Sequence, residues 1–200
     1  GDAMRIWDAA SGRELRSVPI DAMGTTGFVT GGSGFTLNAD GTQLLMVDSD
    51  SGKGQMKFVE LSDGREARSV KLSDGDVNSG EVAVTPAGNV FAAGIVDKRM
   101  KLWTIGSGSS EKDLGPTHKE FSVIKFSRDG RFVALSENYN VKIWEVASGR
   151  ELTQLAIPNN GNMNQNDQAT MASAFVAFSE DGNKLASGGF DTPTILWDTS

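Results

Sequence analysis

The stretch 126–152 is the clearest copy of a unit that the chain repeats. Apolar runs at 131–136 and 141–145 are separated by breaks at Asp129-Gly130 and Ser148-Gly149. Runs rich in β-branched and aromatic residues, broken by Asp-Gly and Ser-Gly pairs, are typical of antiparallel strands joined by tight turns. The unit therefore predicts three strands, with a fourth that begins at Arg150.

The unit recurs with an aromatic or branched residue near the end of its third strand. These third-strand marks stand at Trp7, Val59, Trp103, Trp144 and Trp197. The two middle separations lie near the roughly 40–45-residue period of four-stranded propeller blades. The two outer separations are longer, so they require insertions within 19–34 and 158–170.

The repeat predicts an all-β fold, a β-propeller of four-stranded antiparallel blades, with about four blades and a partial N-terminal blade. A small sheet cannot bury both faces alone, so stacking blades around an axis is the natural arrangement. A two-sheet sandwich is the alternative, and the fixed period favours the propeller. We expect one propeller domain or segment over 1–200, with a partial blade in 1–20 and blades at about 27–71, 80–114, 120–156 and 171–200.

The composition narrows the function classes. A net charge of −7 and a pI near 4.8 argue against a phosphate-binding surface, so nucleic acid is not expected as a partner. The absence of cysteine removes disulfides and thiol catalysis, and it fits a reducing compartment. No apolar run reaches the roughly 18 residues that span a bilayer. We expect a cytoplasmic protein without a membrane partner, and a targeting segment upstream would be compatible with this sequence.

The end of the third strand resembles the closing dipeptide of the WD-repeat family of β-propellers. Trp7-Asp8, Trp144-Glu145 and Trp197-Asp198 match that dipeptide, and Trp103-Thr104 matches half of it. The resemblance covers essentially the whole chain and implies a propeller. This fold carries many functions, so the resemblance indicates fold more strongly than function.

The resemblance also implies a hydrogen-bonded network within each blade. In the family, a His before the first strand and a Ser or Thr in the second join an Asp and the Trp. Ala93 takes the Ser position in one blade and Val59 takes the Trp position in another, so these networks are incomplete. The residues assigned structural roles by this resemblance are His118, Ser136, Asn138, Trp144, Asp97, Trp103, Ser187, Asp191 and Trp197.

The resemblance raises the question of how the ring closes. Seven blades are usual in the family and need roughly 300 residues, so we expect a segment of a longer chain. A ring shared by two copies is the alternative, because open blade edges allow self-association. The family commonly closes its rings by offset strands, and 13–17 would then supply the fourth strand of the last blade.

No motif in the chain predicts catalysis, a metal or a cofactor. His118 is the single histidine, and the network gives it a structural role in place of general-base chemistry. The acidic stretches 74–80 and 48–52 lack the closing Glu of a calcium loop. The glycine-rich stretches 51–54 and 106–109 match no phosphate loop.

The remaining distinctive feature is an Asn-rich stretch, 159–166, in the second insertion. It is either a plain polar loop or a binding loop on the face that also carries the turns between second and third strands. Exposed aromatics and Arg are frequent interface anchors. The residues predicted to contact a partner are Arg99, Tyr139, Asn160, Asn164 and Phe190.

These observations predict a propeller without catalysis that serves as a scaffold for protein partners. A sensor or regulatory domain within a larger enzyme, of protease or kinase type, is the first alternative. A propeller hydrolase or lyase is the second, and it would need converging acids around the channel.

Overall fold

The computed structural model describes residues 3–19, 35–48, 54–75, 77–106, 109–117, 123–137, 140–156, 175–189 and 192–199. Within these ranges every regular element is a β-strand. No helix in the described part of the chain is long and apolar enough to cross a membrane.

The strands in the described ranges form five antiparallel sheets in chain order. The N-terminal hairpin pairs β1 (Ala3–Trp7) with β2 (Glu14–Pro19). Blade I consists of β3 (Phe35–Leu37), β4 (Gln43–Asp48), β5 (Gln55–Glu60) and β6 (Glu66–Lys71). Blade II consists of β7 (Asn78–Val84), β8 (Val90–Val96), β9 (Arg99–Ile105) and β10 (Ser110–Pro116). Blade III consists of β11 (Val123–Phe126), β12 (Phe132–Glu137), β13 (Asn140–Glu145) and β14 (Glu151–Ala156). The terminal sheet consists of β15 (Phe175–Phe178), β16 (Lys184–Gly189) and β17 (Thr192–Asp198).

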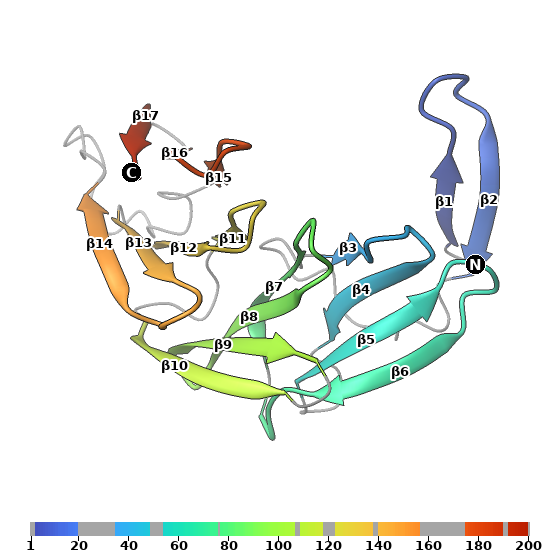
Figure 1. Cartoon of the computed structure of the whole chain (residues 1–200), viewed down its shortest axis with the longest axis horizontal. Coiled ribbons are helices and arrows are strands. Elements are labelled where there is room, and N and C mark those ends of the chain that lie inside the picture. Colours follow the sequence, from blue (N-terminus) through green and yellow to red (C-terminus); the bar gives the residue numbers. More distant parts are fainter. Residues whose placement is uncertain are drawn as a thin grey trace, which may run out of the picture.

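The sheets follow one another along an open arc (Figure 1). The N-terminal hairpin lies at one end of the arc and the terminal sheet lies at the other. The first strands of neighbouring sheets are in contact, because β7 touches both β3 and β11, and β11 touches β15. Each blade therefore extends outward from its first strand to its fourth strand.

The apolar core is divided into clusters between neighbouring sheets. One cluster joins blades I and II around Phe58 and Trp103. A second joins blades II and III around Leu102 and Trp144. Because a β-strand points alternate side chains to opposite faces, each blade supplies residues to the clusters on both of its sides.

The other two clusters join the terminal sheet to blade III and the N-terminal hairpin to blade I. Ile143 of blade III and Trp197 of the terminal sheet belong to one of them. In the other, Ile6 of the N-terminal hairpin packs against Val59 and Leu61 of blade I. Stacking therefore buries the sheet faces that no single sheet could bury alone.

The expectation that 13–17 completes the last blade is wrong for this structure. β2 pairs with β1 and lies at the end of the arc away from β17 (Figure 1). A tight turn holds the hairpin together, with the Asp8 amide donating to the Arg13 carbonyl and the Gly12 amide to the Asp8 carbonyl, each at 2.8 Å. Closing this short loop costs far less conformational entropy than pairing across the whole arc.

Candidate interaction surface

Strand direction sorts the turns onto two faces of the arc. Neighbouring strands are antiparallel, so second-to-third-strand turns and the connections that leave fourth strands lie at the same end of each sheet. We call this end the upper face, and its described members include 72–75, 97–98 and 117. The lower face carries the first-to-second-strand turns, such as 127–131, and the third-to-fourth-strand turns, such as 146–150.

Charged side chains run along β9 and β10 of blade II, from Arg99 beside the upper-face turn to Glu111 near the lower end of β10. Arg99 donates Nε to Asp113 Oδ2 at 2.6 Å and Nη2 to Asp113 Oδ1 at 2.9 Å. Lys101 Nζ lies 2.8 Å from Glu111 Oε1 and 3.3 Å from Asp113 Oδ2. We call Arg99, Lys101, Glu111 and Asp113 the charged cluster. The cluster contains two positive and two negative side chains on the paired strands β9 and β10.

The charged cluster is electrostatically matched. The hydrogen bond from Arg99 lowers the pKa of the Asp113 carboxyl to about 2, against the opposing effect of partial burial. Asp113 in turn raises the pKa of Arg99, and Glu111 raises that of Lys101. Arg99, predicted as a partner-binding residue, is therefore half-exposed and already engaged in a bidentate ion pair.

The turn beside the cluster is tight and strained toward the left-handed region. Asp97 and Lys98 have φ values of 48° and 58°, and the flanking residues Val96 and Arg99 pair directly. Two positive φ values in a two-residue hairpin are typical of a type I′ turn. The turn therefore presents an acid and a base side by side at the tip of blade II, where both side chains are exposed.

The Trp103 indole finds its partner in the charged cluster. Its Nε1 donates to Glu111 Oε2 at 3.1 Å, and the two residues face each other across β9 and β10. Asp97, which the family pattern links to this Trp, makes no hydrogen bond to it among the described residues. In this blade the ring is thus anchored by the fourth strand.

In blade III the network differs from the one that the resemblance implies. Trp144 Nε1 donates to the Leu114 carbonyl of blade II at 3.1 Å, so it does not bind Ser136. The buried Ser136 Oγ has no hydrogen-bond partner among the described residues. The Leu114 carbonyl thus takes the place that the resemblance gives to the Ser136 hydroxyl.

The terminal sheet keeps the implied Ser–Trp contact. Trp197 Nε1 donates to Ser187 Oγ at 2.8 Å. Ser187 is fully buried, and the bond to Trp197 is partly buried. Of the implied Ser–Trp pairs, the structure therefore brings together this one.

Several predicted residues lie outside the described part of the chain. They are His118, Asn138, Tyr139, Asn160, Asn164, Phe190 and Asp191. Their predicted roles stay predictions. Among the described residues, no group of three or more His, Asp or Glu side chains is arranged to hold a metal ion.

Sequence reasoning missed two ion pairs between or beside the inner strands. Lys125 Nζ of β11 lies 2.9 Å from Glu81 Oε1 of β7, which links blades II and III. Burial raises the pKa of Glu81, and the contact with Lys125 opposes that change. In blade III, Lys142 Nζ lies 3.4 Å from the buried Glu137 Oε1. In both cases the sequence offered one indication of a buried ion pair, a charged residue within an otherwise apolar strand.

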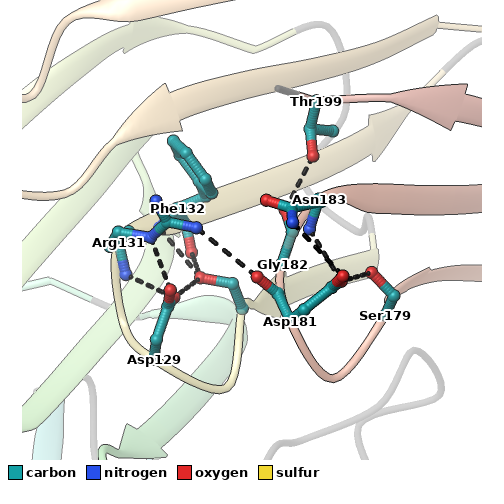
Figure 2. A network of polar contacts seen from close by, with 9 residues as sticks. Asp129, Arg131, Phe132, Ser179, Asp181, Gly182, Asn183 and Thr199 are labelled. Atoms are coloured by element: carbon teal, nitrogen blue, oxygen red, sulfur yellow. Dashed lines mark hydrogen bonds and ion pairs between the residues drawn. The ribbon is translucent and has the colours of Figure 1, made fainter.

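The lower face is organised by acids that close turns (Figure 2). Asp181 Oδ1 accepts from the Ser179 hydroxyl at 2.6 Å and from the Asn183 amide at 3.0 Å, and these bonds lower the pKa of Asp181. Burial raises the pKa of Asp129, but bonds from the Arg131 amide and the Ser127 hydroxyl outweigh burial, so its pKa is lowered. These acids are local hydrogen-bond acceptors within turns.

Adjacent lower-face turns also contact each other. Arg128 of blade III forms an ion pair with Glu180 of the terminal sheet. Arg131 Nη2 reaches the Asp181 carbonyl at 3.4 Å (Figure 2). These contacts join the lower-face turn of blade III to that of the terminal sheet.

Comparison with known proteins gives the same architecture. No family model matches the sequence. The WD repeat-containing protein VIP3 of Arabidopsis thaliana is 25% identical over 122 residues, which cover 58% of this chain and 38% of that protein. The β-propeller domain of Myceliophteria thermophila Cps50 (Swd1) superposes with a TM-score of 0.67 at 15% identity, covering 100% of this chain and 64% of that one. The fold is a β-propeller, and the sequence is similar to that of a WD repeat-containing protein.

The structure also resembles a chain of an enzyme. Hydrazine synthase of Kuenenia stuttgartiensis superposes with a TM-score of 0.66 at 11% identity, covering 100% of this chain and 66% of that one. Similarity at this level concerns the fold alone. The chain spans 38% of the length of the curated relative and about two thirds of each of these solved chains. The predicted fold class, with four-stranded antiparallel blades and a partial N-terminal blade, is confirmed.

Proposed function

We propose that this WD-repeat propeller is a non-catalytic scaffold that binds protein partners through its upper face. The observation that carries the proposal is the charged cluster, whose upper end at Arg99 adjoins the Asp97–Lys98 turn. It presents charges of both signs on a rigid pair of strands, and proteins use such patterns to orient a partner and to reject wrong ones. The comparisons support the coarser statement that the chain has the fold of WD-repeat interaction proteins.

Rigidity supports this role. Trp103 beneath the cluster is buried and bonded to Glu111, so the strands that carry the charges are tied to the core. A surface that is ordered before binding loses less conformational entropy when it meets its partner. The charged cluster is therefore better suited to selecting a protein partner than to binding it tightly.

The shifted pKa values support a role without catalysis. A general base needs a nucleophile or substrate within reach, and each acid with a lowered pKa instead closes a turn or faces a base. Glu81, with a raised pKa, is paired with Lys125. One solved neighbour is an enzyme by name, so the side chains and not the fold support this part of the proposal.

A second candidate is a sensor or regulatory domain of a larger enzyme. The similarity to a chain of hydrazine synthase favours it, because that enzyme contains the same fold. On this reading the upper face would contact a catalytic domain of protease or kinase type in place of a separate scaffolded protein. The identity of the bound polypeptide distinguishes the two candidates.

The sequence contains no cysteine, so a single introduced thiol can be labelled at a chosen position. A Lys98→Cys variant places one thiol on the upper face, and Ala87→Cys places one on an exposed lower-face turn as a matched control. Each thiol is labelled with a photoactivatable maleimide and irradiated in an extract of the native cells. We expect a protein adduct from Lys98→Cys that Ala87→Cys does not give. Equal adducts from both positions, or adducts from Ala87→Cys alone, would contradict the proposal.

A further inference from the structure

The charged cluster and one indole form a continuous series of donors and acceptors along β9 and β10. Arg99 Nε donates to Asp113 at 2.6 Å, and Asp113 also lies 3.3 Å from Lys101 Nζ. Lys101 donates to Glu111 Oε1 at 2.8 Å, and the other oxygen of Glu111 accepts from Trp103 Nε1 at 3.1 Å. We call the charged cluster together with Trp103 the polar ladder. Each inner member contacts two others, so a change at one contact alters the partners that remain for the next.

The register of β9 and β10 produces this order. Lys101 pairs directly with Asp113, and Trp103 pairs directly with Glu111, so the four side chains share one face of blade II. Arg99 lies on the same face, next to the turn that joins β8 to β9. Along β9, the distance from Arg99 to Trp103 is about 13 Å at the usual rise of a strand. The polar ladder therefore extends from the upper-face turn well down the blade.

The two ends of the polar ladder lie in different environments. The Arg99 side chain is 47% exposed, and the adjacent Asp97 and Lys98 are exposed as well. Trp103 is 2% exposed, and it belongs to the apolar cluster that joins blades I and II. Between them, the Lys101 side chain is mostly enclosed. The ladder therefore connects a surface that a partner can reach with the boundary between two blades.

The inner base–acid contact of the polar ladder has equivalents in other sheets. In the N-terminal hairpin, Arg5 Nη1 lies 3.5 Å from Glu14 Oε2, and in blade I, Lys57 Nζ lies 3.9 Å from Glu66 Oε2. In both sheets the base lies two residues before the third-strand mark, and the acid pairs with that mark. This recurrence indicates that the inner contact belongs to the repeat itself.

The outer contact, between Arg99 and Asp113, belongs to blade II and not to the repeat. The equivalent positions in blades I and III hold uncharged residues, which are Gln55, Ser69, Asn140 and Gln154. The indole of blade III also has a different partner, because Trp144 donates to the Leu114 carbonyl. Among the three described four-stranded blades, blade II is therefore the one in which charged contacts of this kind run from the third-strand Trp to the upper-face turn.

We propose that the polar ladder transmits the binding of a partner from the upper face to the boundary between blades I and II. The partner supplies a carboxylate that takes Arg99 from Asp113, because a guanidinium forms strong bidentate pairs with carboxylates. Asp113 then draws Lys101 toward itself and away from Glu111. Glu111, which loses one donor, becomes a stronger acceptor for the Trp103 indole. The partner in this scheme rests on the proposed function, whereas the coupling within the ladder does not.

The indole N–H resonances of the nitrogen-labelled chain, recorded in proton–nitrogen correlation spectra, test the coupling. The sequence has four tryptophans, and Trp103→Phe identifies the resonance of Trp103 by its loss. Arg99→Gln frees Asp113 as a partner carboxylate would, so the Trp103 proton should move downfield, as it does in a stronger hydrogen bond. Asp113→Asn instead releases Lys101 to Glu111, so the same proton should move upfield. Shifts in opposite directions are therefore expected for the two variants.

Matched controls separate the polar ladder from other causes of a shift. Lys98→Gln removes the same charge as Arg99→Gln from the adjacent position, outside the ladder, and should leave the Trp103 resonance in place. Glu111→Gln removes the charge of the acceptor itself and should move the Trp103 proton upfield. The Trp197 resonance should stay in place in every variant, because its indole is bonded to Ser187 in the terminal sheet.

A Trp103 resonance that moves in Glu111→Gln but in neither Arg99→Gln nor Asp113→Asn overturns the proposal. Shifts of the last two variants in the same direction, or an equal shift from Lys98→Gln, overturn it as well. If Arg99→Gln unfolds early, Arg99→Lys replaces it, since it keeps the charge and loses the bidentate pair. The spectra are those of the free chain, so a failed coupling leaves the crosslinking test of the upper face unaffected, and a failed crosslink leaves the coupling.

Discussion

The Trp144 indole donates its N–H to the Leu114 carbonyl at 3.1 Å, so the third strand of blade III is tied to the fourth strand of blade II. The bond is buried and spans two blades. Lys112 strengthens the same boundary by donating to the Val146 carbonyl at 2.9 Å. Neighbouring blades are thus joined by polar contacts as well as by apolar packing.

Replacement of Trp144 by Ala should lower the free energy of unfolding by about 3–5 kcal/mol, because a buried ring is lost and a cavity remains. Trp7→Ala is the matched control, since its ring is exposed, and it should cost below about 0.5 kcal/mol. Urea unfolding followed by circular dichroism measures both changes. Similar costs for the two variants would contradict the assignment of Trp144 to the core.

Two buried serines should respond differently to removal of their hydroxyls. Ser187→Ala deletes the acceptor of Trp197 Nε1 and should cost about 1 kcal/mol, with an upper range of about 3 kcal/mol for the orphaned donor. Ser136→Ala removes a hydroxyl with no partner among the described residues, so it should be neutral or slightly stabilising. Chemical denaturation of the two variants in parallel is the measurement. A larger loss for Ser136→Ala would mean that its hydroxyl is bonded to residues outside the described ranges.

Two turn glycines separate backbone strain from packing. Gly41 and Gly130 have φ values of +71° and +72°, so Ala is strained at both, by about 1–2 kcal/mol. A Cβ at Gly41 meets nothing within 4 Å, whereas one at Gly130 would lie 2.4 Å from a Thr85 methyl carbon. Gly130→Ala should therefore lower the melting temperature clearly more than Gly41→Ala. Equal shifts would show that the blade II and blade III turns are not in contact.

Acid should weaken the charged cluster in a defined window. The pKa of Asp113 falls from 3.8 to about 2 on folding, so its stabilising effect is full above pH 3.8 and is lost as the pH falls through about 2. The pair is partly exposed, so its contribution is below about 1 kcal/mol. Asp113→Asn should lower stability at pH 6 and match the wild type near pH 2. Stability curves that run parallel from pH 6 to pH 2 would contradict this assignment.

The strands and turns were predictable because they depend on short-range chemistry. Alternating apolar runs and Asp-Gly breaks specify hairpins locally, and Asp129 and Asp181 accept hydrogen bonds within two residues of themselves. The repeat of Trp7, Trp103, Trp144 and Trp197 then indicated the stacking. The exposure of Arg99 also followed from its place beside a turn.

The partners of buried polar groups were not predictable in the same way. Whether the Trp144 indole meets Ser136 or the Leu114 carbonyl depends on how blades II and III pack against each other. Leu114 and Trp144 are 30 residues apart in the sequence. The pairing of Arg99 with Asp113 depends on the register of β9 and β10, which shifts between Asp113 and Gly115. A shift of one residue in either place would change the partner without changing any local pattern.

By itself the sequence determined a succession of four-stranded sheets, because hydrophobic alternation and turn chemistry act over a few residues. Only the tertiary structure decided which groups meet between sheets, because those contacts require atoms from distant segments to lie within about 3 Å of each other.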